Sequence, residues 1–87
     1  MTTTQVMNKN IDYYMSLLYP ILLIPDEDGY WFAEIPLLKG CMTNGEGLQD
    51  ALQMLDDAKQ GWLETALAHH MTIPEPDPEK TLVVTYA

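Results

Sequence analysis

The pattern of apolar and polar positions predicts two helices, with several short strands between them in the sequence. Apolar residues return every three or four positions between Gln5 and Leu18, and again between Leu48 and His69, as on a helix with one buried face. The second stretch is the clearer one, because a polar stripe fills its opposite side. Its apolar stripe consists of Leu48, Ala51, Leu52, Leu55, Ala58, Trp62, Leu63, Ala66 and Leu67.

Three extended runs are predicted between these helices. Residues 19–25 (YPILLIP) follow the proline that ends the first helix, and they form a continuous apolar run typical of a mostly buried strand. Residues 30–35 (YWFAEI) alternate between two faces, as a half-buried strand does. The intervening DEDG predicts a β-hairpin, and residues 41–44 predict a short third strand that glycines bring to an end.

The C-terminal part predicts an extended linker and one more strand. Prolines and acids alternate over residues 74–79, which favours a semi-rigid extended chain. Residues 81–86 (TLVVTY) are rich in β-formers and are expected to add to the edge of this sheet or of another chain's sheet. The element order is then α-β-β-β-α-β.

This order predicts an α+β domain with a three- to four-stranded antiparallel sheet, one long helix packed on one face, and an N-terminal helix. The other face of the sheet stays open and carries Tyr30, Phe32 and Leu22, which favours association with a partner or a second copy. The expected core consists of Ile21, Leu23, Trp31, Ala33, Ile35, Cys41, Leu52, Leu55, Trp62 and Leu63.

Composition narrows the class of function. The 87 residues suffice for one domain, and 13 acids against four lysines give a formal charge of −9. That field repels nucleic acid and attracts a basic protein. One cysteine cannot form an internal disulfide, the N-terminus lacks a signal peptide, and no apolar run is long enough to span a bilayer. We therefore expect a soluble cytoplasmic protein without direct nucleic-acid or membrane binding.

No catalytic, metal or cofactor site is predicted. Cys41 has no base within reach, because the only histidines, His69 and His70, lie at the far end of the long helix, and packing is the better interpretation. Adjacent histidines diverge on a helix, which suits its C-terminal end better than a metal. The acids Asp26, Glu27, Asp28 and Glu34 leave three alternatives open, namely a solvated turn, a patch for a basic partner, and a Mg²⁺-dependent nuclease.

Several short motifs occur in a combined order that carries a resemblance. PDEDG is followed by YWFAEIP, KGCMTNGE, a helix opening with LQDALQMLDDAKQGWLE, and IPEP. Over residues 19–76 this order resembles the HicB-like antitoxin family. The resemblance implies a partial ribonuclease-H-like sheet without its active site, which binds and blocks a small basic HicA-type ribonuclease toxin. Residues 1–18 then form an N-terminal helix, and residues 77–87 a C-terminal linker and strand.

The sequence departs from the family pattern at three places. Only DPEKTLVVTYA follows IPEP, so the DNA-binding region of many members is not expected. Residues 37–39 (LLK) replace a more polar turn, which is expected to alter the contact surface. Gly47 stands where a Ser or Thr usually caps the long helix, and we expect a slightly weaker cap.

The leading hypothesis is an antitoxin that binds its toxin and covers the toxin's RNA-binding face. Self-association as a dimer or a higher oligomer is expected through the N-terminal helix or the C-terminal strand, most simply as a symmetric dimer. The alternative is a solitary oligomeric scaffold or regulator without a toxin partner. The residues expected to contact the toxin are Asp26, Glu27, Asp28, Tyr30, Phe32, Glu34 and Glu46.

Overall fold

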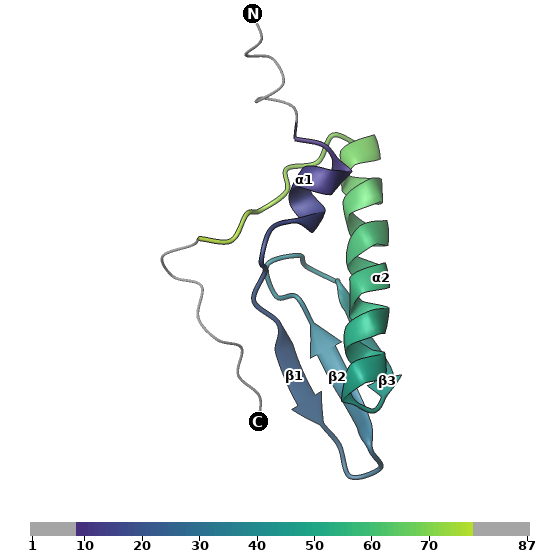
Figure 1. Cartoon of the computed structure of the whole chain (residues 1–87). Helices are drawn as coiled ribbons and strands as arrows, with labels where there is room; N and C mark the ends of the chain where they lie inside the picture. Colours follow the sequence, from purple (N-terminus) through teal and green to yellow (C-terminus); the bar gives the residue numbers. More distant parts are fainter. Residues whose placement is uncertain (1–8, 78–87) are drawn as a thin grey trace, which may run out of the picture.

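A computed structural model of the chain describes residues 9–77 and confirms the predicted α+β architecture. One short helix leads into a three-stranded sheet, and one long helix packs on that sheet (Figure 1). The predicted strand at residues 81–86, and residues 1–8 of the predicted first helix, lie outside the described residues. The elements are α1 (Ile11–Met15), β1 (Leu22–Pro25), β2 (Tyr30–Glu34), β3 (Met42–Glu46) and α2 (Leu48–Ala68).

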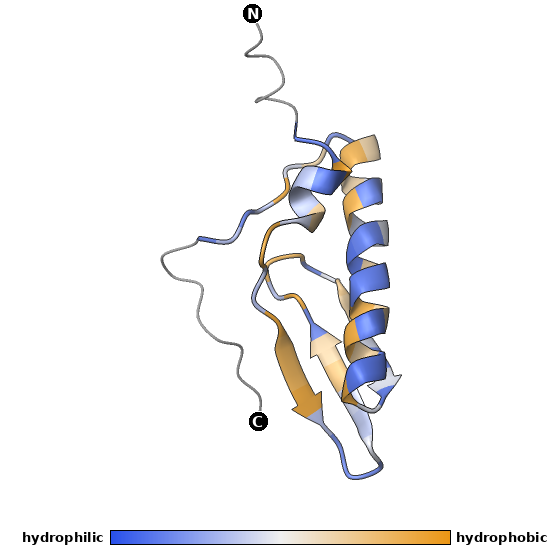
Figure 2. Cartoon of the chain, viewed as in Figure 1, coloured by the Kyte–Doolittle hydropathy of each residue, from blue (hydrophilic) through white to orange (hydrophobic). Residues whose placement is uncertain are grey.

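The sheet is antiparallel throughout, in the order β1-β2-β3. Ala33 at its centre stands opposite Leu23 on one side and Thr43 on the other, and Trp31 stands opposite Gly45. The long helix packs across β2 and β3, and neither described helix lies over β1 (Figure 1). The strand β1 is nonetheless hydrophobic along most of its length (Figure 2).

The hairpin between β1 and β2 is held by one side chain. Oδ1 of Asp26 accepts hydrogen bonds from the backbone N–H groups of Asp28, at 2.8 Å, and Tyr30, at 3.0 Å. The Asp26 N–H in turn donates to the Tyr30 carbonyl. A short side chain that binds backbone groups two and four residues on fixes the turn locally. The predicted hairpin is therefore confirmed, and its register follows from this turn.

Two glycines determine how α2 meets β3. Gly45 was expected to end the third strand but lies buried inside it, where an added Cβ would overlap the backbone of Ala51. Gly47 precedes α2 with φ of 92°, a region that favours glycine over Ser or Thr. Instead of a capping side chain at that position, the Asp50 carboxylate accepts from the Glu46 N–H at 2.9 Å. The helix α2 therefore begins without a side-chain cap at Gly47.

The structure confirms the predicted core except for Leu52. Ala33, Ile35, Cys41, Leu55 and Leu63 are buried, and the other predicted members except Leu52 are partly buried. Leu52 is 37% exposed and is therefore not part of the core. The expected core omitted the buried residues Tyr14, Tyr19, Leu38, Ala51, Ala66 and Ile73, although Ala51 and Ala66 belong to the predicted apolar stripe of the long helix.

The first helix is shorter than predicted and begins at Ile11, with Asn10 as its N-terminal cap. Oδ1 of Asn10 accepts from the Tyr13 N–H, and the Ser16 hydroxyl donates to the Tyr13 carbonyl. These two polar side chains compete for backbone groups at either end and limit the helix to little more than one turn. The predicted extension to Leu18 is wrong, and Leu18 is exposed.

The end of α2 closes in a Schellman motif. The Met71 N–H donates to the Ala66 carbonyl at 2.9 Å, and the His70 N–H donates to the Leu67 carbonyl at 3.2 Å. His70 itself has φ of 55°, in the left-handed region. The two histidines end the helix as predicted, but through backbone geometry rather than through their rings.

Residues 71–77 have no regular structure, as predicted for the linker, yet part of it is fixed against the N-terminal segment. The Tyr19 hydroxyl donates to the Pro74 carbonyl at 2.6 Å, and burial raises the pKa of this hydroxyl to about 12. Glu75 accepts from Lys9 at 3.0 Å and from the Tyr13 hydroxyl at 2.8 Å. The chain is therefore anchored where it leaves α2.

Candidate partner-binding face

The face of the sheet that points away from α2 brings most of the predicted contact residues together. Because directly opposite residues of an antiparallel sheet share a face, the register assigns one set of side chains to this side. We call it the open face. It consists of Leu22, Ile24, Tyr30, Phe32, Glu34, Met42, Asn44 and Glu46.

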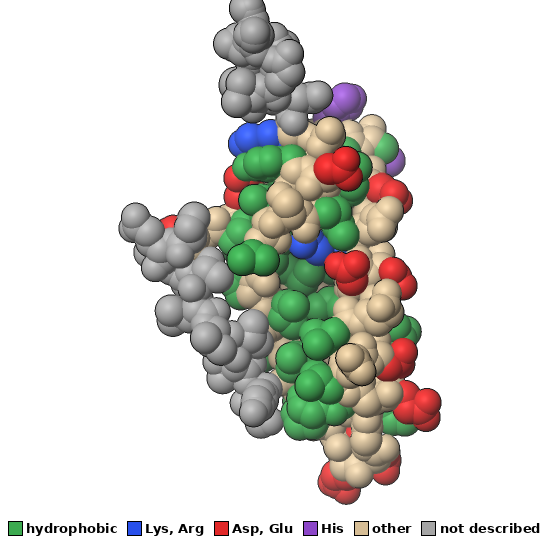
Figure 3. All heavy atoms as spheres, viewed as in Figure 1, with side chains coloured by type: hydrophobic (Ala, Val, Ile, Leu, Met, Phe, Trp, Pro, Cys, Tyr) green, Lys and Arg blue, Asp and Glu red, His purple; other side chains and the backbone are tan. Residues whose placement is uncertain are grey.

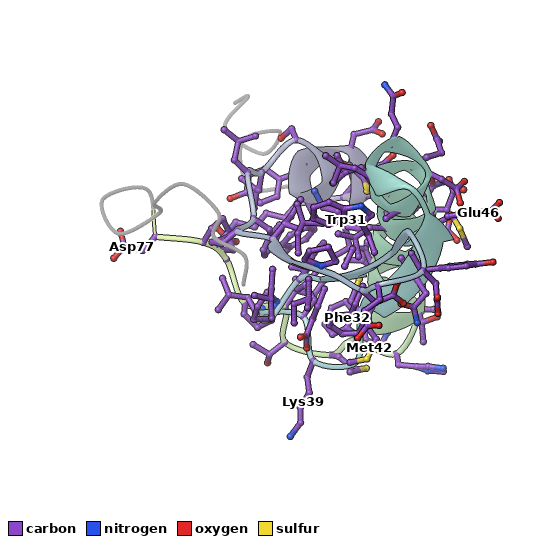
Figure 4. All side chains as sticks on the ribbon, turned by 90° about the horizontal axis from the view of Figure 1, so that it is seen from below. Trp31, Phe32, Lys39, Met42, Glu46 and Asp77 are labelled. Atoms are coloured by element: carbon purple, nitrogen blue, oxygen red, sulfur yellow. The ribbon has the colours of Figure 1, made fainter. Side chains whose placement is uncertain are left out.

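Apolar side chains occupy the middle of the open face. Exposed fractions are 37% for Ile24, 43% for Tyr30 and 45% for Met42, while Leu22 and Phe32 are half-buried. Figure 4 shows Phe32 and Met42 on the side of the sheet opposite Trp31, which points toward the core. Exposed apolar residues that share one sheet face make this face a candidate interaction surface.

Carboxylates surround and interrupt this apolar group. Glu34 stands between Leu22 and Met42 in the register and is half-buried, and Glu46 stands opposite Tyr30 at the rim. Further acids gather at the hairpin end of the molecule and along the outer side of α2 (Figure 3). An apolar centre with acids within and around it suits a partner that presents apolar and basic side chains.

The three hairpin acids, Asp26, Glu27 and Asp28, differ in whether their carboxylates are engaged in hydrogen bonds within the turn. Asp26 uses one carboxylate oxygen to hold the turn, so its first role is structural. Glu27 and Asp28 are exposed in the turn beside the open face. The structure therefore brings Tyr30, Phe32, Glu34 and Glu46 together on one face and leaves the three hairpin acids at its end.

Cys41 is placed as a packing residue. It is 2% exposed, and its backbone closes the turn after β2, with the Ile35 N–H donating to the Cys41 carbonyl at 3.0 Å. Burial raises the pKa of the thiol, which disfavours the reactive thiolate. Within residues 9–77, no three His, Cys, Asp or Glu side chains are grouped closely enough to hold a metal ion.

The turn after β2, which includes residues 37–39, contributes to the hydrophobic core and is not only a surface loop. Leu38 is fully buried, and the indole N–H of Trp62 donates to the Lys39 carbonyl at 2.9 Å. The expectation that residues 37–39 change the contact surface therefore does not apply to Leu38. Leu37 and Lys39 remain exposed.

Lys59 is a buried polar residue that the sequence pattern did not reveal. Its ammonium donates to the carbonyls of Met15, at 3.3 Å, and Leu17, at 3.2 Å, and lies 5.1 Å from the centre of the Tyr19 ring. Burial lowers its pKa. The residue fixes the N-terminal segment to α2. Its spacing of four residues from both Leu55 and Leu63 was the signal available in the sequence.

Comparison with known families decides where this chain belongs. Residues 19–85 match a family described as the HicB-like antitoxin of bacterial toxin–antitoxin systems. The chain belongs to the HicB-like antitoxin family. The match takes in all three strands and α2, whereas α1 precedes it. No solved structure matches the chain.

Curated relatives of this HicB-like chain carry the family name UPF0150. UPF0150 protein ssl0259 of Synechocystis is 43% identical over 61 residues, which cover 70% of this chain and 84% of the relative. UPF0150 protein Ta0767 of Thermoplasma acidophilum is 32% identical over 65 residues, covering 75% of this chain and 94% of the relative. None of the helices within residues 9–77 is both long and apolar enough to cross a membrane.

Proposed function

We propose that this protein is a cytoplasmic, non-enzymatic antitoxin that binds a small basic ribonuclease toxin of the HicA type and covers its RNA-binding surface. The open face is the observation that carries this proposal. It combines an exposed apolar centre with the carboxylates of Glu34 and Glu46, on a chain of formal charge −9. A toxin that binds RNA presents basic side chains, and the same side chains complement this face.

Glu34 is the centre of the proposed contact. It lies on the middle strand between two apolar side chains, so a cation that binds there becomes surrounded by apolar groups and loses water. Charge pairs in such surroundings contribute more than pairs at a solvated rim. Phe32 and Tyr30 supply apolar area along the same strand, on the side of Glu34 toward the hairpin. Glu27, Asp28 and Glu46 act at the rim, where they speed the encounter rather than hold the complex.

Binding between the full chain and the small basic protein encoded by the neighbouring reading frame tests the proposal. We expect a complex by calorimetry and loss of that protein's ribonuclease activity on titration. Glu34→Gln should weaken binding at least about tenfold, which corresponds to about 1.4 kcal/mol. Asp57→Asn is the matched control, because it removes the same charge from the exposed outer side of α2.

Three results contradict the proposal in different ways. Equal affinities for the two variants would show that net charge, rather than the open face, governs binding. Absence of any complex would favour the solitary scaffold or regulator. Cleavage of RNA by this chain itself in Mg²⁺, abolished by Asp26→Asn, would favour the nuclease alternative.

A further inference from the structure

Lys59 carries a buried positive charge that pairs with no carboxylate of residues 9–77. Its exposed fraction is 8%, and the ion pair found in this part of the chain joins Lys9 to Glu75 instead. The sequence contains 13 acids, so the missing counter-ion does not reflect a shortage of carboxylates. Taking a charge out of water is costly unless hydrogen bonds and an opposite charge compensate. The ammonium is therefore suited to bind an anion that can reach it.

The ammonium of Lys59 uses two of its three N–H donors within the fold. It donates to the carbonyls of Met15, at 3.3 Å, and Leu17, at 3.2 Å, and it lies 5.1 Å from the centre of the Tyr19 ring. Both hydrogen bonds are longer than the distance of about 2.7–2.9 Å typical of an ammonium bound to a carboxylate. Among the described residues no acceptor is found for the third donor. One donor is thus available to a ligand.

The Lys59 side chain lines a small pocket between α2 and the end of the sheet at which β1 begins. The volume of this pocket is about 80 Å³. A cavity needs about 10–15 Å³ to hold one water molecule, so this pocket has room for a ligand of a few heavy atoms. Figure 3 shows, in the middle of the molecule, a basic side chain among hydrophobic ones with an acidic side chain beside it. The other lining residues are Tyr19, Ile21, Ile35, Leu52, Leu55 and Asp56.

We propose that this pocket binds a small monocarboxylate, such as acetate, with the ammonium of Lys59 as its counter-ion. The carboxylate would accept a hydrogen bond from the third N–H, and the short carbon chain would contact the apolar walls. This apolar lining favours a ligand with a hydrocarbon end over a simple inorganic ion.

Asp56 restricts the charge that the ligand can carry. Its carboxylate lies at the pocket, on the same helix as Lys59 and three residues before it, and the residue is exposed. It repels any anion that enters, and it repels a doubly charged anion such as sulfate more strongly than a singly charged one. The pocket therefore combines one cation, one weaker repulsive charge and apolar walls, which suits a monocarboxylate.

This assignment goes beyond the proposed function, because it concerns a different surface. The pocket lies on the side of the sheet covered by α2, whereas the open face points away from α2. Burial lowers the pKa of Lys59, and a bound carboxylate would raise it by stabilising the charged form. Because Lys59 also holds the carbonyls of Met15 and Leu17, the ligand would strengthen the attachment of the N-terminal segment to α2.

Titration of the full chain with sodium acetate, followed by nuclear magnetic resonance, tests the proposal. Sodium chloride keeps the ionic strength constant, and sodium sulfate serves as the comparison anion. We expect saturable shifts of the Tyr19, Ile21 and Leu55 amide signals with a Kd of about 1–10 mM, as suits so small a ligand. The pKa of Lys59, followed through its Cε signal, should be higher in acetate than in chloride. Equal responses to acetate and sulfate would show screening of charge alone and overturn the assignment.

Two asparagine variants of the full chain supply a matched pair. Asp56→Asn and Asp57→Asn each remove one exposed negative charge from α2, but only Asp56 lines the pocket. The first should tighten acetate binding about threefold, and the second should change it by less than about 1.5-fold. Equal affinities of the two variants, or no saturable response in the unaltered chain, would overturn the assignment.

Lys59→Met should abolish the saturable response, and circular dichroism shows whether this variant folds. If it does not fold, the asparagine pair still decides the question, because neither aspartate takes part in holding the N-terminal segment. Dilution of the protein without acetate covers the remaining occupant. Shifts of the same amide signals that follow the protein concentration would place a second copy in the pocket and overturn the assignment.

Discussion

Replacing Gly45 with alanine tests the packing on which the whole arrangement depends. Gly45 is buried in β3 and faces the first turn of α2, where an added methyl group would overlap the main-chain atoms of Ala51. Its φ does not lie in the left-handed region, so alanine introduces steric overlap without backbone strain at the site. Main-chain atoms cannot rotate away as a side chain can. Relief therefore requires α2 to move off the sheet at its N-terminal end.

The magnitude follows from what that movement would disrupt. Ala51 is fully buried, and α2 makes its most extensive contacts with β3. Overpacking a well-packed site costs about 1–3 kcal/mol and sometimes more, and overlap with backbone belongs at the upper end. We expect Gly45→Ala to lower the free energy of unfolding by about 3 kcal/mol. The total for a domain of this size is about 4–13 kcal/mol.

Urea denaturation, followed by tryptophan fluorescence and circular dichroism, measures the loss. With a slope of about 1 kcal/mol per molar urea, the midpoint should fall by about 3 M. Gly61→Ala is the control of opposite sign, because Gly61 lies on the exposed side of α2 with no atom near an added Cβ. Alanine there should raise the stability by up to about 1 kcal/mol. A Gly45→Ala midpoint within 1 M of the unaltered protein would refute the steric argument.

Two further predictions concern the two ends of the linker. His70→Gly should stabilise the protein by about 1 kcal/mol, because glycine adopts the left-handed conformation without steric cost, whereas His69→Gly should destabilise it, since φ there is −102°. Calorimetric melting temperatures would show the opposite signs. Hydrogen bonds from Lys9 and Tyr13 lower the pKa of Glu75, so this carboxylate contributes stability above pH 4.5 that is lost as the pH falls through its folded-state pKa. The difference in urea midpoint between the unaltered chain and Glu75→Gln should therefore shrink in acid and in 1 M salt, and a constant difference would contradict this account.

The sequence pattern predicted the elements whose periodicity is set by burial on one face. The stripe along α2 and the alternation along β2 appear in the structure as expected, because each pattern repeats often enough to identify its face. The same alternation placed Tyr30, Phe32 and Glu34 on the open face. The hairpin was predictable because Asp26 and Gly29 form its turn through interactions within a few residues.

The features that the pattern missed depend on residues distant in sequence. Lys59 binds the carbonyl of Met15, 44 positions away, and Tyr19 binds Pro74, 55 positions away. No local pattern contains either contact. Gly45 resembled a strand-ending glycine because nothing in its neighbourhood indicates that α2 returns to pack against it. The predicted first helix was too long for a related reason. Apolar spacing predicts which face of a helix is buried, but the side chains of Asn10 and Ser16 determine where this helix begins and ends.

The proposed function requires an open face that favours a basic partner over the open face of a second copy. Acids cover the outer side of α2 and the hairpin end, and two copies of a chain with formal charge −9 repel each other. Pairing two open faces would also bury the Glu34 carboxylate of one copy against that of the other, which costs free energy. A basic partner avoids this cost because its cation neutralises the carboxylate. The same carboxylate therefore disfavours self-association through that face and favours a cationic partner. In the proposed complex, Glu34 supplies the specificity of the open face, and its apolar neighbours contribute the buried area.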